Sequence, residues 1–181
     1  MRLKMLFFLT LGLLLFHCNE DNVSQDKAET QTEIDARTIS SADVEAIVYT
    51  EFNLSADAQK AVTDWQKYKD LKVQVENLKK PDFSFFADER TSLLIFINDL
   101  KTEMPNAIKT KPILARFTAF DTKLQKFNSI LRLNTSTKTE KLEGIQEFFI
   151  SFSNLNLQIN KKLEFEKNNV SRPNMNPSTQ L

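Results

Sequence analysis

The sequence predicts an all-α protein: an up-down-up-down four-helix bundle preceded by a short extra N-terminal helix. Three observations favour this fold class. Apolar residues recur three and four positions apart over long stretches, as on one face of an amphipathic helix. Residues typical of helix starts precede several of these stretches. The 181 residues include 15 Phe but only two Gly, Gly12 and Gly144, which disfavours turn-rich β folds and phosphate-binding loops.

The N-terminus has the features of an export signal. Arg2 and Lys4 precede an apolar run over 5–16, which as a helix would span only roughly 18 Å, well short of the roughly 30 Å hydrocarbon core of a bilayer. We therefore interpret residues 1–17 as a signal peptide rather than a transmembrane helix. The run ends in the sequence LFHC, and Cys18 is followed by polar and acidic residues.

This ending resembles the lipobox of bacterial lipoproteins, in which the cysteine becomes the lipidated first residue. Leu15 matches the lipobox three places before Cys18, whereas His17 stands where a small residue is usual. The resemblance covers only the first 22 residues. It implies a lipid anchor on Cys18 in the bacterial cell envelope, at the periplasmic or surface face of the outer membrane. An ordinary cleaved signal that leaves a free thiol, or an uncleaved anchor, are the alternatives.

Residues 18–40 are predicted to form a disordered acidic tether. The segment has no aromatic residue and no apolar period, and acidic residues outnumber basic ones eight to two over 19–46. Such a segment cannot bury enough apolar surface to offset its ordering entropy. A flexible chain of about 20 residues would let the anchored domain reach roughly 25 Å from the membrane. The tail 168–181 is likewise predicted to be disordered, which leaves 41–167 as the helical bundle.

The first helix of the bundle is expected to be short, opened by a capping box at Ser40 and Asp43 and reaching residue 52. Residues 44–54 are rich enough in β-branched and aromatic side chains to form a strand instead, and helix is preferred because no pairing partner is evident. A longer helix is then expected, capped by Ser55 and continuing to residue 80.

Three further helices are predicted, over 84–104, 112–133 and 137–166. The first stops before Pro105, the second has Pro112 in its first turn, and a capping box of Thr137 and Glu140 opens the third. Their short connections make successive helices antiparallel neighbours. Asn156 interrupts the apolar stripe of the last helix, where it is expected to set the packing register or to tilt to the surface.

The residue types present exclude several kinds of chemistry. Downstream of Cys18 the chain has no Cys and no His, which excludes zinc sites built on these residues, His-ligated haem and nucleophilic triads that use them. Without glycine-rich loops there is no Walker or Rossmann nucleotide site. Glu140, Glu143 and Glu147 are expected to complement the helix dipole and face water rather than hold a cation. We predict no enzyme activity, no cofactor and no metal.

A basic flank on the helix predicted over 112–133 is the candidate binding site. Lys109, Arg116 and Lys123 lie seven positions apart, along one side of the apolar stripe. They either dock an anionic partner or lipid headgroups, or they cover the edge of the core and pair with acids on neighbouring helices. The chain as a whole carries 24 basic and 24 acidic residues, so its charge gives no reason to expect a nucleic-acid partner.

Taken together, these features predict a non-enzymatic cell-envelope lipoprotein that acts as an interaction or scaffold module. Its expected partners are the membrane, through the lipid anchor, and a protein. Two alternatives are a carrier or sensor of an apolar ligand held between the Phe stripes of the bundle, and an immunity-type inhibitor of a toxin.

Overall fold

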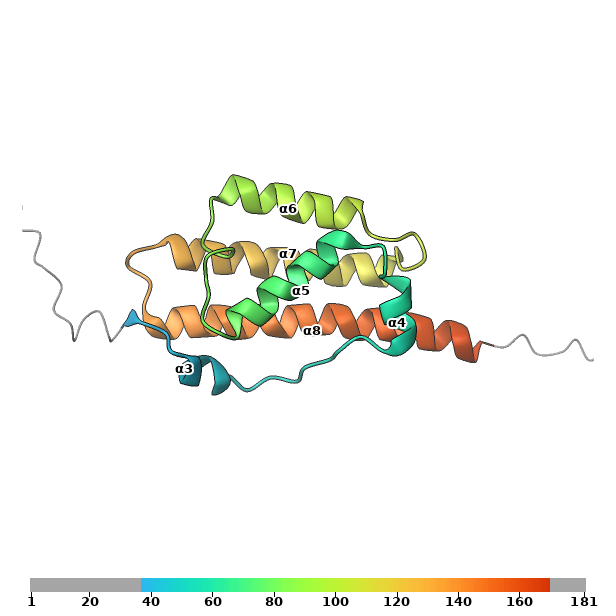
Figure 1. The fold of residues 1–181 in the computed structure, drawn as a ribbon, viewed down its shortest axis with the longest axis horizontal. Coiled ribbons are helices and arrows are strands. Elements are labelled where there is room, and N and C mark those ends of the chain that lie inside the picture. Colours follow the sequence, from blue (N-terminus) through green and yellow to red (C-terminus); the bar gives the residue numbers. More distant parts are fainter. Residues whose placement is uncertain (1–36, 170–181) are drawn as a thin grey trace, which may run out of the picture. The chain divides into compact units, whose positions relative to one another are not determined.

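The computed structural model describes residues 37–169, and this part of the chain is all-helical (Figure 1). Its helices are α3 (Ser41–Glu45), α4 (Ala56–Ala61), α5 (Gln66–Leu78), α6 (Arg90–Thr102), α7 (Lys111–Arg132) and α8 (Lys138–Asn168), with no strand among the described residues. Within residues 37–169, no helix combines the length and the apolarity that a membrane crossing needs. The predicted signal peptide, Cys18, most of the tether and the tail beyond residue 169 lie outside the described residues.

The two longest helices, α7 and α8, pack side by side in opposite directions (Figure 1). Their predicted starts are confirmed. Pro112 lies in the first turn of α7. The capping box of α8 is complete, because the Thr137 hydroxyl accepts from the Glu140 backbone amide at 3.2 Å while the Glu140 carboxylate accepts from the Thr137 amide at 2.8 Å. Helix α6 packs against α7, α5 against α6, and α3 and α4 against α8.

Gly144 allows α7 and α8 to approach closely. A Cβ atom at this position would lie 3.0 Å from a ring carbon of Phe127 and 3.3 Å from the Ile130 side chain. Glycine inside a helix costs about 1 kcal/mol relative to alanine. Here that cost accompanies a contact between the helices that a larger residue would obstruct.

Closely packed phenylalanine rings fill the centre of the described domain. Phe148 is fully buried, and its ring centroid lies 5.0–6.5 Å from those of Phe86, Phe120, Phe127, Phe149 and Phe152. Contacts at these spacings add to the stabilisation that comes from burying the rings. Phe120, Phe127, Phe149 and Phe152 belong to the stripes predicted from the sequence and meet around Phe148, which those stripes did not include.

The prediction of a helix reaching residue 52 is wrong. The capping box at Ser40 and Asp43 does open α3, but the helix ends at Glu45. Residues 47–54 continue outside any helix or strand and run beside α8 (Figure 1). Their β-branched and aromatic side chains favour this extended course, and side chains of α8 provide their hydrogen-bond partners.

The helix predicted from Ser55 to residue 80 is broken in two. Ser55 caps α4 as expected, and its hydroxyl accepts from the Ala58 amide at 3.2 Å. The helix then stops, and α5 begins at Gln66. The break accompanies the burial of Trp65, whose indole N–H donates to the Leu100 carbonyl at 2.8 Å. A buried indole needs such a partner.

The helix predicted over 84–104 begins later, at Arg90. Residues before it form turns in which the Asp82 carboxylate accepts from the Ser84 amide and hydroxyl. The buried side chain of Asn128 donates to the carbonyls of Phe86 and Asp88 at 2.8 and 2.9 Å. Because these carbonyls are satisfied by a distant amide, the turn is stabilised in place of another helical turn.

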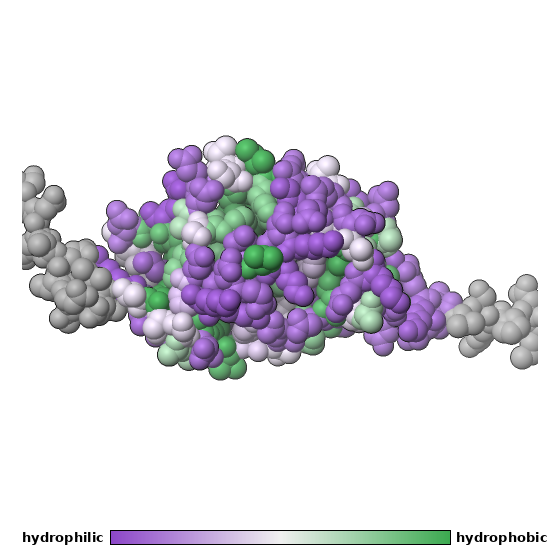
Figure 2. Space-filling model, viewed as in Figure 1, coloured by the Kyte–Doolittle hydropathy of each residue, from purple (hydrophilic) through white to green (hydrophobic). Residues whose placement is uncertain are grey.

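The visible face of the domain is mostly hydrophilic, with apolar side chains in small separate groups (Figure 2). Large exposed apolar residues occur on several elements, namely Val48, Val73, Leu94, Ile95, Leu133, Ile150 and Phe165. They belong to α5, α6, α8, the segment after α3 and the loop after α7.

Candidate functional site

The structure brings two of the three residues of the predicted basic flank together. Arg116 and Lys123 lie on the same side of α7, two turns apart, and both line a groove between α7 and α8. Lys109 lies in the loop before α7, is exposed, and does not line this groove. The helix begins at Lys111, so the seven-residue spacing does not extend to Lys109.

The groove between α7 and α8, called here the α7–α8 groove, has a volume of about 270 Å³. It is lined by Arg116, Ala119, Lys123, Glu147, Ile150, Ser151 and Asn154. Ile150 is 41% exposed, which is high for a large aliphatic side chain. The groove therefore offers an apolar contact beside charged groups.

Some of the charged side chains of the α7–α8 groove form ion pairs within the described part of the chain, and Arg116 does not. The Glu147 carboxylate accepts from Lys126 at 2.7 Å and pairs with Lys123 at 3.2 Å, and these hydrogen bonds, that of Lys126 foremost, lower the pKa of Glu147. Lys123 is thus already paired with an acid on the neighbouring helix, which is one of the two alternatives given for the basic flank. Arg116 is exposed and has no hydrogen bond or ion pair to any residue in the described range.

The three glutamates at the start of α8 do not gather into a site. Glu140 belongs to the capping box, where hydrogen bonds from Thr137 lower its pKa. Glu147 is held by the lysines of α7, and Glu143 is exposed between them. Over residues 37–169, no three acidic, Cys or His side chains come close enough together to hold a metal ion.

Polar side chains on one face of α8 bind the backbone of residues 48–55, which we call the clasped segment. Gln146 donates to the Val48 carbonyl at 2.9 Å. The Ser153 hydroxyl donates to the Thr50 carbonyl at 2.8 Å and accepts from the Phe52 amide at 2.6 Å. A helix face therefore takes the place that a partner strand would occupy.

Two asparagines complete this set of contacts. Asn160 donates to the Asn53 carbonyl at 2.8 Å and accepts from the Ser55 amide at 2.9 Å. Asn156 donates to the Phe52 carbonyl at 3.1 Å. Each amide side chain thus takes the place of a peptide group in a strand ladder.

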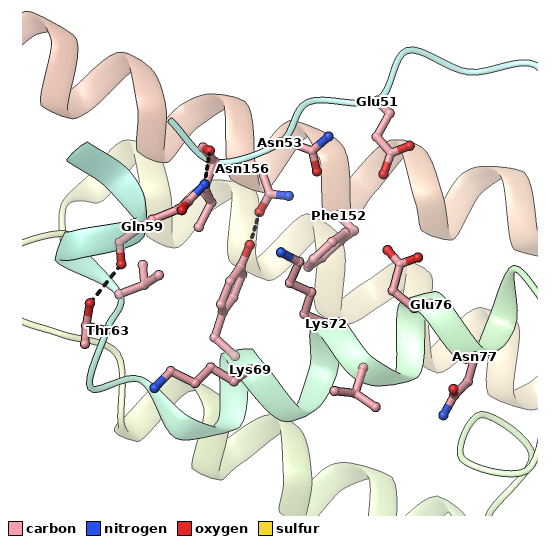
Figure 3. A pocket seen from close by; sticks show the side chains of 14 residues that line it. Glu51, Asn53, Gln59, Thr63, Lys69, Lys72, Glu76, Asn77, Phe152 and Asn156 are labelled. Carbon is pink, nitrogen blue, oxygen red and sulfur yellow. Dashed lines mark hydrogen bonds between the residues drawn. The ribbon is translucent and has the colours of Figure 1, made fainter. Parts of the chain in front are cut away.

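The amide oxygen of Asn156 also accepts a hydrogen bond from the hydroxyl of Tyr68 on α5, at 2.7 Å (Figure 3). Both side chains are buried, and burial raises the pKa of Tyr68, so the phenol stays protonated and donates. Of the two alternatives expected for Asn156, tilting to the surface is wrong, and setting the packing register remains. Its polar atoms connect α8, α5 and the clasped segment, and a single residue at this point aligns the three.

Sequence reasoning missed the clasped segment, although a signal for it exists. Gln146, Ser153, Asn156 and Asn160 are spaced seven, three and four apart, so they form a polar line along one side of the helix, beside its apolar stripe. Such a line indicates that the helix face meets a backbone rather than side chains. No family model matches the chain, and neither does any curated protein or solved structure.

Proposed function

We propose that the chain is a non-enzymatic lipoprotein of the bacterial cell envelope whose helical domain binds a protein partner. The observation that carries the interaction part is the exposed, unpaired guanidinium of Arg116 beside the exposed Ile150 in the α7–α8 groove. An arginine binds a carboxylate through two parallel hydrogen bonds, and a neighbouring apolar residue adds buried area at the contact. The partner surface is therefore acidic, with an apolar side chain that meets Ile150.

The anchor rests on the sequence around Cys18. An apolar run too short to cross a bilayer ends in LFHC and is followed by the acidic segment up to residue 40. Lipidation of Cys18 would hold the domain at the outer membrane, on its periplasmic or surface face, and the tether would set its reach. Labelled palmitate should be incorporated into the wild-type chain and not into Cys18→Ala. Label that persists in Cys18→Ala would overturn the anchor.

We also infer that α5, α6, α7 and α8 act together as an up-down-up-down four-helix bundle, with α3 and α4 as short additions. Contacts between α5 and α6, α6 and α7, and α7 and α8 support this arrangement, as do the alternating directions of these helices in Figure 1. In such a bundle α7 and α8 present one shared outer surface. The α7–α8 groove would then be a rigid docking site rather than a mobile loop.

An interaction module accounts for the packing better than a carrier that holds an apolar ligand between the Phe stripes. Five rings surround Phe148 at contact distance, so the space where the stripes meet is occupied by the protein itself. The side chains that a partner can reach are instead those on the surface, such as the ones that line the α7–α8 groove.

Charge reversal in the α7–α8 groove tests the interaction. The wild-type lipidated chain serves as bait for proteins from solubilised envelope membranes, compared with Arg116→Glu and with Lys101→Glu as a matched reversal of an exposed lysine on α6. Capture should fall at least fivefold for Arg116→Glu, remain for Lys101→Glu, and weaken with added salt. Equal capture by both variants would remove Arg116 from the docking site.

A further inference from the structure

A second groove, larger than the first, lies between the clasped segment, α4 and α5, and α8 forms its floor (Figure 3). Its volume of about 520 Å³ falls within the range of about 300–1,000 Å³ that small-molecule sites occupy. It shares no residue with the α7–α8 groove. We call it the α5 groove.

Apolar side chains contribute to the floor and walls of the α5 groove. Leu54, Val62, Val73 and Phe152 line it, together with the ring of Tyr68. The polar atoms at its floor are already satisfied, because the Tyr68 hydroxyl donates to Asn156, which in turn donates to the clasped segment. The apolar part of a ligand can therefore cover this floor without leaving a buried polar group without a hydrogen-bond partner.

The charges at the rim leave the α5 groove with an excess of one positive charge. Both acidic residues of the lining, Glu51 and Glu76, pair with the Lys79 ammonium, at 2.8 and 3.2 Å. Lys69 and Lys72, one helical turn apart on α5, have no ion-pair partner within residues 37–169. Lys79 does not itself line the groove, but it offsets one of the two glutamate charges. With Lys69 and Lys72, three lysines therefore stand against two glutamates, so a ligand with a single negative charge matches the site.

The position of Lys72 shows where that charge would lie. Its side chain extends into the groove, on the same side as Phe152 and Asn156 (Figure 3). An ammonium binds a carboxylate as a point charge, without the planar geometry that arginine imposes. An anionic group at Lys72 would leave the rest of the ligand over Phe152 and Val73.

We propose that the α5 groove is a binding site for a small monocarboxylate with an apolar or aromatic body. The proposal goes beyond the interaction module, because it concerns a different face of the domain and a ligand rather than a protein. The carboxylate is held by Lys72, and the body contacts the apolar floor.

The test uses a matched pair of probes, 1-naphthoate and its uncharged isostere 1-naphthamide. Each is titrated calorimetrically into the full chain in lipid nanodiscs, with empty nanodiscs as the blank. One molecule of naphthoate should bind per chain, about three- to fivefold more tightly than naphthamide, since an exposed ion pair contributes that much. Lys72→Met should remove this preference, while Lys72→Arg should keep it.

Two further variants separate the site from general effects. Lys101→Met removes an exposed lysine on α6 and should leave both affinities unchanged. Val73→Trp fills the groove at a residue that is 56% exposed, so it should fold normally and weaken both probes at least fivefold. The proposal is overturned if no binding of naphthoate is detected at its highest soluble concentration, or if naphthoate binds no more tightly than naphthamide. It is equally overturned if Val73→Trp changes neither affinity or if Lys101→Met acts like Lys72→Met.

Discussion

Removal of the hydrogen bond between Tyr68 and Asn156 tests whether buried polar contacts align α5, α8 and the clasped segment. The two side chains are 3% and 4% exposed, and they lie 2.7 Å apart, hydroxyl to amide oxygen. Asn156 also donates to the Phe52 carbonyl at 3.1 Å. Asn156→Ala therefore leaves the Tyr68 hydroxyl and the Phe52 carbonyl without their partner.

The expected magnitudes follow from the number of groups left unpaired. A buried polar group without a partner costs about 1–3 kcal/mol, so Asn156→Ala, which leaves two such groups, should lower the free energy of unfolding by about 2–6 kcal/mol. Tyr68→Phe leaves only one amide oxygen unpaired and should cost about 1–2 kcal/mol. In the double variant neither member remains, so its loss should be smaller than the sum of the single losses by about 1–2 kcal/mol.

Urea titration followed by tryptophan fluorescence measures these losses. Trp65 is the single tryptophan of the chain, is fully buried, and stacks on Tyr68 with ring centroids 5.1 Å apart. Asn160→Ala is the matched control, because Asn160 binds the clasped segment without a hydrogen bond to Tyr68. Its loss should add to that of Tyr68→Phe within about 0.5 kcal/mol. Simple additivity for Asn156→Ala and Tyr68→Phe would refute the reasoning.

Two more perturbations address the core and the N-terminal cap of α3. Phe120 is fully buried, so Phe120→Ala should lower the free energy of unfolding by about 3–5 kcal/mol in urea titrations, and a loss below about 1 kcal/mol would mean that this face of α7 does not meet the core. Hydrogen bonds from Lys138 and Ser40 lower the pKa of Asp43, so its ionised form is favoured in the folded state. The corresponding stability should be complete above about pH 4 and be lost as the pH falls towards the lowered folded-state pKa. Thermal melts between pH 7 and pH 2 should therefore show a shallower acid loss for Asp43→Asn, and superimposable curves would contradict the role of Asp43.

Helix starts with a side-chain cap were predictable because the chemistry of the cap is local. Ser40, Ser55 and Thr137 each bind a backbone amide three residues ahead, and a short stretch of sequence contains both partners. The apolar stripes of α7 and α8 were predictable for the same reason, since helical periodicity identifies the buried face.

Helix ends and breaks were not predictable, because distant side chains decide them. Ser153 binds the backbone of residues 50 and 52, about a hundred positions earlier in the chain. Asn128 similarly holds the turn at Phe86, 42 positions earlier. A local propensity argument contains neither partner, so it extended the first predicted helix and began the third one too early.

The candidate site shows the same division. The spacing of Arg116 and Lys123 correctly placed both on one side of a helix. The pairing of Lys123 with Glu147 depends on the register between α7 and α8, which close packing at Gly144 helps to set. The α5 groove is formed by three separate stretches of the chain, and no spacing in the sequence brings its lysines and its apolar floor together.

Site-specific photo-crosslinking in intact membranes tests the central claim most directly. A photoreactive residue at Ala119, in the α7–α8 groove, is compared with one at Ile95, which is exposed on α6. The account predicts one discrete crosslinked protein from position 119, lost when Arg116→Glu is added, and no such product from position 95. The same products from both positions, or a product at 119 that persists in Arg116→Glu, would contradict it.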